Sequence, residues 1–213
     1  MARVAIIYYS STGGTWQLAT QVERGAASTG CETRLRKARE LAPDEAIDRR
    51  PGWREHLDAT KSVPEAEVTD LDWADGLVFG SPARFGLPSA QLKQFIDQAG
   101  PLWRENKLKD KPVSVFGGAS LPNGGQEAML LALNTVFYHW GAIIVPVGYT
   151  EPIFAQAGGN PYGVGFTDPK GAGVPQVTLD AAFALGARLG RYTRIIAANR
   201  AALSADSGPG NNG

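Results

Sequence analysis

The chain has 213 residues, of which 43% are hydrophobic and 20% charged, a composition typical of one soluble α/β domain with insertions. Lys plus Arg and Asp plus Glu each number 21, and this zero net charge gives no support for binding to nucleic acid or to a membrane surface, which both need a basic excess. The single cysteine, Cys31, excludes an intramolecular disulfide and a cysteine-based zinc site, and no other metal site is predicted.

The chain opens on the apolar run VAIIYY, residues 4–9. This run is about half as long as the core of a secretory signal peptide. No stretch approaches the ~20 apolar residues of a membrane span. We therefore expect a cytoplasmic protein without membrane insertion.

Three further runs resemble the first one: residues 76–80 (GLVFG), 113–116 (VSVF) and 142–147 (AIIVPV). All four are rich in β-branched residues, nearly continuous, and bounded by Gly, Pro or polar residues. Such runs are typical of strands buried on both faces of a parallel sheet. Residues 31–37 (CETRLRK) alternate instead, which suits an edge strand.

Helical periodicity covers residues 88–99, 126–138 and 176–200. Gly186 and Gly190 lie beside the apolar stripe of the last helix, and we expect them to allow close packing against the sheet. The alternation of strands and helices predicts the α/β class, with five strands in a doubly wound parallel sheet and helices on both faces.

Two segments do not fit the minimal form of this fold. Residues 38–75 are charged and interrupted by proline, and they are predicted to be an insertion between the second and third strands. Residues 150–175 form a long Gly- and Pro-rich loop without periodicity, and loops of this length are usually functional or disordered. Residues 1–203 are expected to form one domain, followed by a disordered tail, 204–213.

The loop after the first strand, SSTGGT (residues 10–15), is the first candidate for binding chemistry. It leads into a helix, whose first N–H groups and partial positive charge suit a phosphate. Glycines allow close approach of the backbone, hydroxyls can donate hydrogen bonds, and no Lys or Arg is present. Taken alone, the loop could equally be a polar turn with a Ser or Thr helix cap.

Two more loops follow the third and fourth strands. SPARFGLP (residues 81–88) presents a guanidinium and an aromatic ring against which a planar ligand could lie, although Phe85 could also be tucked into the core. GGASLPNGG (residues 117–125) could face its amides toward a flat heterocycle, or its glycines could serve tight turns only. Ligands of such folds bind beyond the carboxyl ends of the strands, so all three loops are expected at one rim.

Five segments together carry a family resemblance: YYSSTGGT, FGSPARFG, LKQFIDQAGPLW, GGQE and IIVPVGY. From residue 2 to about 200, broken by 38–75, the chain resembles the WrbA (tryptophan-repressor-binding protein) family of FMN-dependent NAD(P)H:quinone oxidoreductases. This resemblance implies a flavodoxin-like three-layer sandwich with strand order 2-1-3-4-5, FMN as cofactor, and NAD(P)H and quinones as substrates. It also implies a homotetramer or dimer, with sites completed by neighbouring chains through Trp103 and loop 150–175.

The resemblance further implies which residues bind the cofactor and the substrate. The implied FMN-binding residues are Ser10, Ser11, Thr12, Gly13, Gly14, Thr15, Pro82, Ala83, Arg84, Phe85, Gly118, Ala119, Ser120, Asn123, Gly124 and His139. Trp103 and Thr12 are implied to face the substrate, and His139 to be a catalytic residue at the flavin. By sequence alone, His139 could instead have a purely structural role at a helix end.

Two departures from the family pattern concern the nucleotide pocket. Thr12 stands where related sequences carry an aromatic residue, and the loop ASLPNGG is about one residue longer than usual and contains Pro122.

The predicted mechanism is two-electron transfer with ping-pong kinetics, because the nucleotide and the quinone would share one slot on the flavin. A one-electron flavodoxin carrier would use the same loops, but such carriers are typically strongly acidic, unlike this chain. A regulatory module that binds a repressor is the third reading, and no basic, coiled-coil or helix-turn-helix segment supports it.

Overall fold

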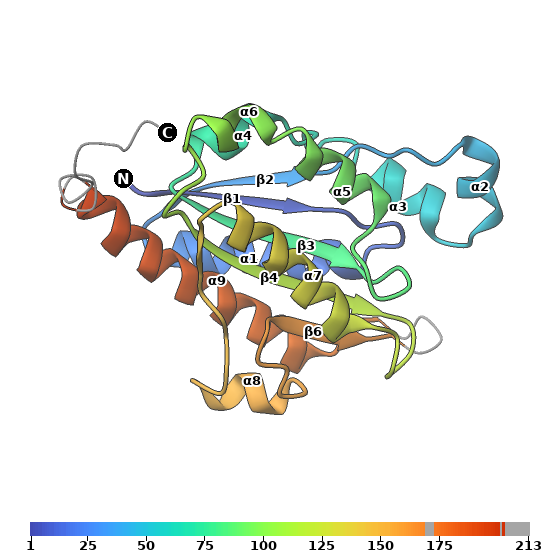
Figure 1. Ribbon diagram of the computed structural model, residues 1–213. Helices are drawn as coiled ribbons and strands as arrows, with labels where there is room; N and C mark the ends of the chain where they lie inside the picture. Colours follow the sequence, from blue (N-terminus) through green and yellow to red (C-terminus); the bar gives the residue numbers. More distant parts are fainter. Residues whose placement is uncertain (169–172, 201, 203–213) are drawn as a thin grey trace.

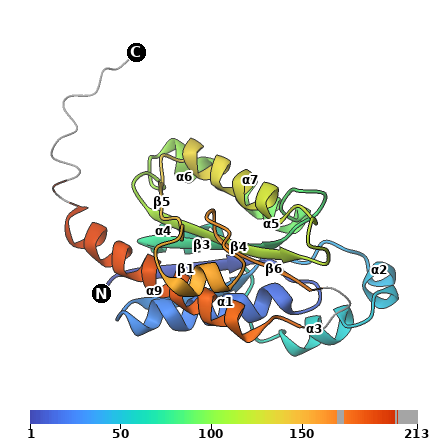
Figure 2. The same ribbon diagram turned by 90° about the horizontal axis from the view of Figure 1, so that it is seen from below.

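The computed structural model describes residues 1–168, 173–200 and 202, and its sheet lies between two helical layers (Figures 1 and 2). The predicted tail 204–213 lies outside the described residues. The strands are β1 (Arg3–Tyr8), β2 (Glu32–Lys37), β3 (Gly76–Pro82), β4 (Pro112–Ala119), β5 (Ile143–Ile144) and β6 (Val164–Thr167). The helices are α1 (Gly14–Ser28), α2 (Asp44–Arg49), α3 (Trp53–Ala59), α4 (Val68–Trp73), α5 (Ala90–Asp97), α6 (Gly100–Arg104), α7 (Gln126–His139), α8 (Pro152–Gln156) and α9 (Gln176–Ala198).

The strands pair in the order β2-β1-β3-β4-β5, and every pairing is parallel. This confirms the predicted order 2-1-3-4-5 and the flavodoxin-like architecture. Because the strands are parallel, the loops that follow β1, β3 and β4 emerge at the same edge of the sheet.

The fifth strand differs from the prediction. Only Ile143 and Ile144 of the run 142–147 pair with the beginning of β4, whereas β6 pairs with its end, from Phe116↔Val164 to Ala119↔Thr167. Pro146 has no N–H to donate, so the run cannot continue as a regular strand. Residues 150–175 are therefore not a structureless loop, since they contain α8 and β6.

Successive residues of the central strands belong to two separate cores, one on each face of the sheet, where helices lie on both sides (Figure 2). Ile7 and Phe79 face α5 and α7, whereas Ile6 and Val78 face α1 and α9. This double burial explains why the strands are continuously apolar.

Close helix packing, rather than helix–sheet packing, explains the glycines of α9. A methyl group at Gly186 would lie 2.0 Å from the carbonyl oxygen of Val22, and one at Gly190 would lie 2.4 Å from Thr29 Oγ1. Both neighbours belong to α1 or its end. The predicted close packing of α9 at these glycines is thus confirmed, but α9 packs there against α1 and not against the sheet.

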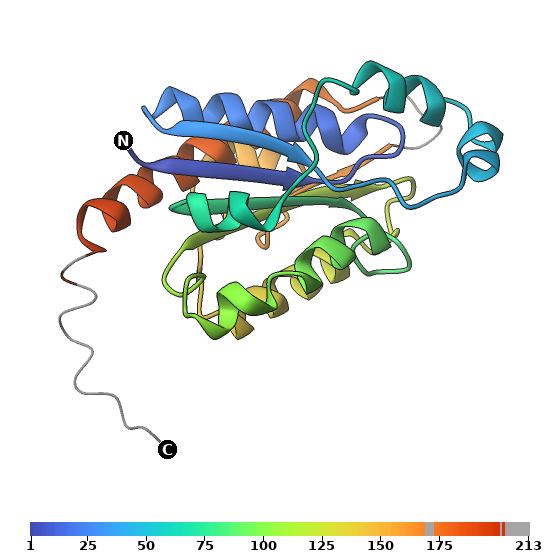
Figure 3. The same cartoon turned by 90° about the horizontal axis from the view of Figure 1, so that it is seen from above.

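The segment 38–75 extends beyond the carboxyl end of the sheet, where α2 and α3 stand (Figures 1 and 3). Its last helix, α4, returns along the sheet toward β3 and contributes Leu71 to the core with α5. Of the helices in the described ranges, none is long and apolar enough to cross a membrane.

Candidate active site

The three candidate loops converge on one small cavity of about 80 Å³ at the carboxyl end of the sheet, which we call the loop cavity. It is lined by Ser10, Ser11, Thr12, Gly14, Thr15, Arg50, Pro82, Ala83, Arg84, Gly118, Ala119, Ser120, Phe166 and Asp168. Eleven of these fourteen are sequence-predicted site residues. The other three, Arg50, Phe166 and Asp168, come from the segments 38–75 and 150–175 and were missed.

The first loop presents the beginning of α1 to the cavity. Gly13 is the N-cap residue, in the left-handed region at φ 101°, and its N–H donates to Ser10 Oγ at 3.0 Å. The N–H of Gln17 donates the first helical hydrogen bond of α1, to the Gly13 carbonyl oxygen at 2.9 Å. The amides of residues 14–16 precede it, and Gly13 has no side chain to cap them. Thr15 is buried beside them.

The second loop is a tight turn that exposes Phe85. Arg84 and Leu87 exchange backbone hydrogen bonds of 2.8 and 3.0 Å, and the residues between them have φ values of 52° and 80°. Two central residues with positive φ correspond to a type I′ turn, which normally holds Asn-Gly rather than Phe-Gly. The Phe85 side chain is fully exposed, so it is not tucked into the core.

Arg84 bends back from this turn over the first loop. Its guanidinium donates to Ser11 Oγ at 3.3 Å and to its neighbour's carbonyl, Ala83 O, at 3.2 Å. Burial lowers the pKa of Arg84, and the positive charge of Arg50 lowers it further. The cavity therefore holds two guanidinium groups, although the first loop has none.

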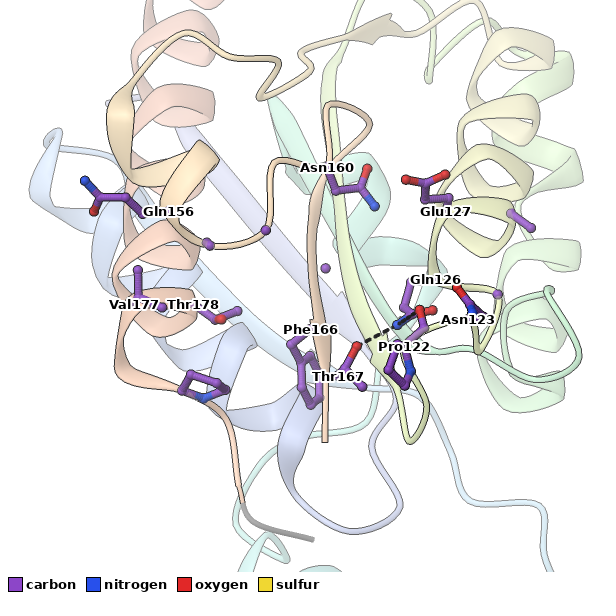
Figure 4. Close-up of a pocket in the computed structure, with 16 residues that line it drawn as sticks. Pro122, Asn123, Gln126, Glu127, Gln156, Asn160, Phe166, Thr167, Val177 and Thr178 are labelled. Carbon is purple, nitrogen blue, oxygen red and sulfur yellow. Dashed lines mark hydrogen bonds between the residues drawn. The ribbon is translucent and has the colours of Figure 1, made fainter. Parts of the chain in front are cut away.

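The third loop is divided between two cavities. Gly118, Ala119 and Ser120 line the loop cavity, whereas Asn123 lines a second, larger cavity of about 710 Å³ around β6, which we call the β6 cavity (Figure 4). Gly124 lines neither of these two cavities.

Phe166 lines both the loop cavity and the β6 cavity, and Figure 4 shows it among the residues of the β6 cavity. A methyl group at Gly118 would lie 2.2 Å from its ring, so the ring occupies the space above that glycine. Gln126 fixes the neighbouring backbone, because its side-chain amide donates to Thr167 Oγ1 at 2.8 Å and to Leu121 O at 3.0 Å. Short sequence patterns gave no signal for Phe166, which is a lone aromatic residue in a Gly-rich stretch.

His139 and Trp103 lie together but far from the loop cavity of their own chain. The indole N–H of Trp103 donates to the backbone carbonyl of His139 at 2.9 Å. α7 starts near the carboxyl end of β4 and its 14 residues run back for about 21 Å, so His139 lies near the beginning of β4. His139 is thus not among the residues that line the loop cavity of its own chain, and its role at the flavin stays a prediction.

No group of three or more His, Cys, Asp or Glu side chains within the described ranges could hold a metal ion.

Comparison with known proteins decides the family. The sequence pattern described as NADPH-dependent FMN reductase matches residues 2–152, which is more than half of the chain. The chain belongs to the NADPH-dependent FMN reductase family. The match ends at the first residue of α8, so the pattern covers all three candidate loops and α7.

Curated relatives extend this membership beyond residue 152. The chain is 43% identical over 165 residues to the NAD(P)H dehydrogenase (quinone) of Deinococcus radiodurans, covering 78% of this chain and 82% of that one. It is 36% identical over 176 residues to a protein of the same name from Archaeoglobus fulgidus, covering 83% and 88%.

Solved structures show the same fold for this member of the NADPH-dependent FMN reductase family. A flavodoxin, WrbA-like protein from Agrobacterium tumefaciens superposes with a TM-score of 0.65 at 23% identity, covering 92% of this chain and 99% of that chain. An archaeal flavodoxin superposes with a TM-score of 0.58 at 12% identity, covering 90% and 99%. At such identities the likeness concerns the fold alone.

Proposed function

We propose that this chain is an FMN-dependent NAD(P)H:quinone oxidoreductase that transfers two electrons per turnover. The observation that carries the proposal is the convergence of residues 10–15, 82–84 and 118–120 on one cavity at the carboxyl end of a flavodoxin-like sheet. Family membership and the two relatives named NAD(P)H dehydrogenase (quinone) support it.

The donor set of the loop cavity fits the phosphate of FMN. A volume of about 80 Å³ suits a phosphate group, and uncapped amides at the start of α1 are natural donors to its oxygens. Ser11, Thr12 and Thr15 add hydroxyl groups. This set lets the chain bind a phosphate monoester at the sheet edge.

The tricyclic ring of a flavin is too large for the loop cavity and requires a surface beside it. The exposed side chains of Phe85, Leu87 and Leu121 stand on the second and third loops at its margin. Exposed apolar groups of this kind usually mark a binding surface. We therefore assign the ring to this margin and the phosphate to the cavity.

Bound FMN would supply the hydride chemistry, and the role of the chain is to bind, orient and tune it. The first loop holds the phosphate end, Arg84 places a positive charge beside Ser11, and the second and third loops flank the ring. One open side of the ring then serves the nucleotide and the quinone in turn, which predicts ping-pong kinetics.

We also propose that chains assemble as a homotetramer or dimer in which Trp103 and His139 serve the site of a neighbouring chain. Their distance from their own loop cavity supports this arrangement, as does the half-exposed side chain of Trp103, at 52%. The family resemblance stated above points the same way.

The test is to purify the chain with FMN and to follow NADH or NADPH oxidation with benzoquinone. Rapid turnover with parallel reciprocal plots is expected. Bound flavin without nucleotide oxidation would contradict the proposal and favour an electron carrier. Failure of the wild-type chain to take up FMN would leave only a regulatory binding module.

A further inference from the structure

The segment 38–75 brings a second arginine to the loop cavity. Residues 10–15 contain no basic side chain, yet Arg50, from the end of α2, lines the cavity beside Ser11, Thr12 and Arg84. None of the roles in the proposed function belongs to a residue of the segment 38–75.

Arg50 has no partner for its positive charge within the part of the chain that the structure describes: its guanidinium makes no ion pair and no hydrogen bond there. The nearby acids of α2, Asp44 and Asp48, are both paired with Arg54. Arg50 forms no ion pair with these two acids and lines the cavity instead.

Neither Glu40 nor Asp168 forms an ion pair with Arg50 in the part of the chain that the structure describes. Glu40 accepts hydrogen bonds from the Tyr9 hydroxyl, the Trp53 indole, the Gln91 amide and two backbone N–H groups. Asp168 lines the cavity, but it comes from the end of β6 and accepts from the backbone N–H of Gly173 at 3.0 Å. Arg50 and Arg84 thus line one small cavity, where burial and the charge of Arg50 lower the pKa of Arg84, and a bound anion would relieve the repulsion between them.

The backbone of Arg50 is linked to the first loop through Trp53, Glu40 and Tyr9. Its carbonyl accepts the N–H of Trp53 at 3.2 Å, and the Trp53 indole donates to Glu40 at 3.0 Å. Glu40 in turn accepts from the hydroxyl of Tyr9 at 2.9 Å, and Tyr9 immediately precedes the first loop. These contacts hold the backbone of Arg50 near that loop, and the exposed Arg50 side chain lines the cavity from there.

We propose that Arg50 binds the phosphate of FMN, so that the segment 38–75 supplies the cation that the first loop lacks. The inference rests on the proposed FMN binding. An arginine adds a charge-assisted hydrogen bond to the neutral donors of residues 10–15 and makes the affinity depend on ionic strength.

The experiment titrates the flavin-free chain with FMN and with riboflavin, which lacks the phosphate, and follows quenching of flavin fluorescence. Arg50→Gln should raise the dissociation constant of FMN about tenfold, as expected for loss of a charged hydrogen bond, and leave that of riboflavin unchanged. The matched control is Arg49→Gln, because Arg49 is the preceding residue, is exposed like Arg50, and does not line the cavity. The affinity of Arg50→Gln for FMN should also depend less on salt than that of the wild-type chain.

Equal FMN affinity in Arg50→Gln and wild type, or equal weakening of FMN and riboflavin, would overturn the inference while the proposed function stands. A wild-type chain that binds no FMN would remove the proposed function and the inference together. Arg50→Lys keeps the charge and should retain most of the FMN affinity, and its failure to do so while Arg49→Gln is normal would count against a charge role.

Discussion

Phe166 packs its ring against Gly118. The ring comes from β6 and the glycine from the neighbouring strand β4, and together they close one side of the loop cavity. This pair makes the shape of the cavity depend on a residue that lies late in the chain.

Gly118→Ala should therefore destabilise the fold. The added methyl would lie 2.2 Å from the Phe166 ring, and overpacking of this kind costs about 1–3 kcal/mol of unfolding free energy. Urea unfolding measures the loss, and the double variant with Phe166→Ala should show a smaller effect of the added methyl than the wild-type background does. Gly100→Ala is the control, because nothing lies within 4 Å of its added methyl. Additive effects of the two substitutions would contradict the contact.

Replacing Ser10 and Thr15 together by Ala should weaken FMN binding by about tenfold or more. Ser10 Oγ holds the N–H of Gly13 at the start of α1, and Thr15 is buried beside the cavity. Fluorescence titration gives the dissociation constant, with riboflavin as the ligand that should be less affected. Unchanged FMN affinity would mean that the phosphate binds elsewhere.

Phe85→Asn should stabilise the chain and impair its activity. Phe85 has φ 52°, is fully exposed, and precedes Gly86 in a type I′ turn, for which Asn-Gly is the preferred pair. Relief of this strain is expected to add about 0.5–1 kcal/mol to the unfolding free energy. If Phe85 borders the flavin ring, quinone turnover should fall in the same variant. A variant that is both less stable and fully active would refute this assignment.

Lys111 predicts a pH dependence of stability. Its Nζ is buried and donates to Leu71 O at 2.6 Å, and burial lowers the pKa of Lys111 to about 8, with the charge of Arg200 adding to the effect. Between pH 8 and the ordinary lysine pKa, the unfolded chain binds more protons than the folded one, so this residue makes stability rise with pH.

The measurement compares urea unfolding of the wild-type chain and Lys111→Met from pH 7 to 9.5. The wild-type chain should gain stability relative to the variant as the pH rises. The range stops below 10 because burial raises the pKa of Tyr8 and Tyr9, whose ionisation favours the unfolded state at higher pH. A constant difference across the range would show that Lys111 titrates normally.

If Trp103 and His139 serve the site of a neighbouring chain, two variants that are inactive alone should restore activity when they assemble together. His139→Ala and the Ser10/Thr15 double variant should each turn over quinone slowly by themselves. Hybrid oligomers of the two should recover activity, because some sites combine an intact first loop with an intact His139 from a neighbour. Sedimentation should find an oligomer, and a monomeric active chain would exclude the arrangement.

Sequence patterns predicted the strands and helices whose burial is visible in their own hydrophobic pattern. The strands around residues 4–9, 76–80 and 113–116 are apolar throughout because both of their faces are covered, and α9 has a long amphipathic period. Loops that follow these strands could then be placed at one edge from topology alone. The cytoplasmic location, the domain limit at residue 203 and the individual cofactor contacts stay predictions.

Features that depend on tertiary contacts could not be predicted from the sequence. β6 has only four residues, and its pairing with β4 depends on where the chain returns after α8. Arg49 and Arg50 stand side by side in the sequence as identical residues, and only the fold shows that Arg50, not Arg49, lines the cavity. The distance of His139 from the first loop follows from the direction of α7, which its apolar period does not reveal.

The division of the fifth strand into β5 and β6 has a consequence for local opening. The two halves bond to different ends of β4 and are separated by residues 145–163, so β6 can detach without releasing β5. Amide hydrogens of residues 164–167 should exchange with deuterated solvent sooner than those at the centre of β4, and each such excursion would carry the Phe166 ring away from Gly14 and Gly118, against which it lies.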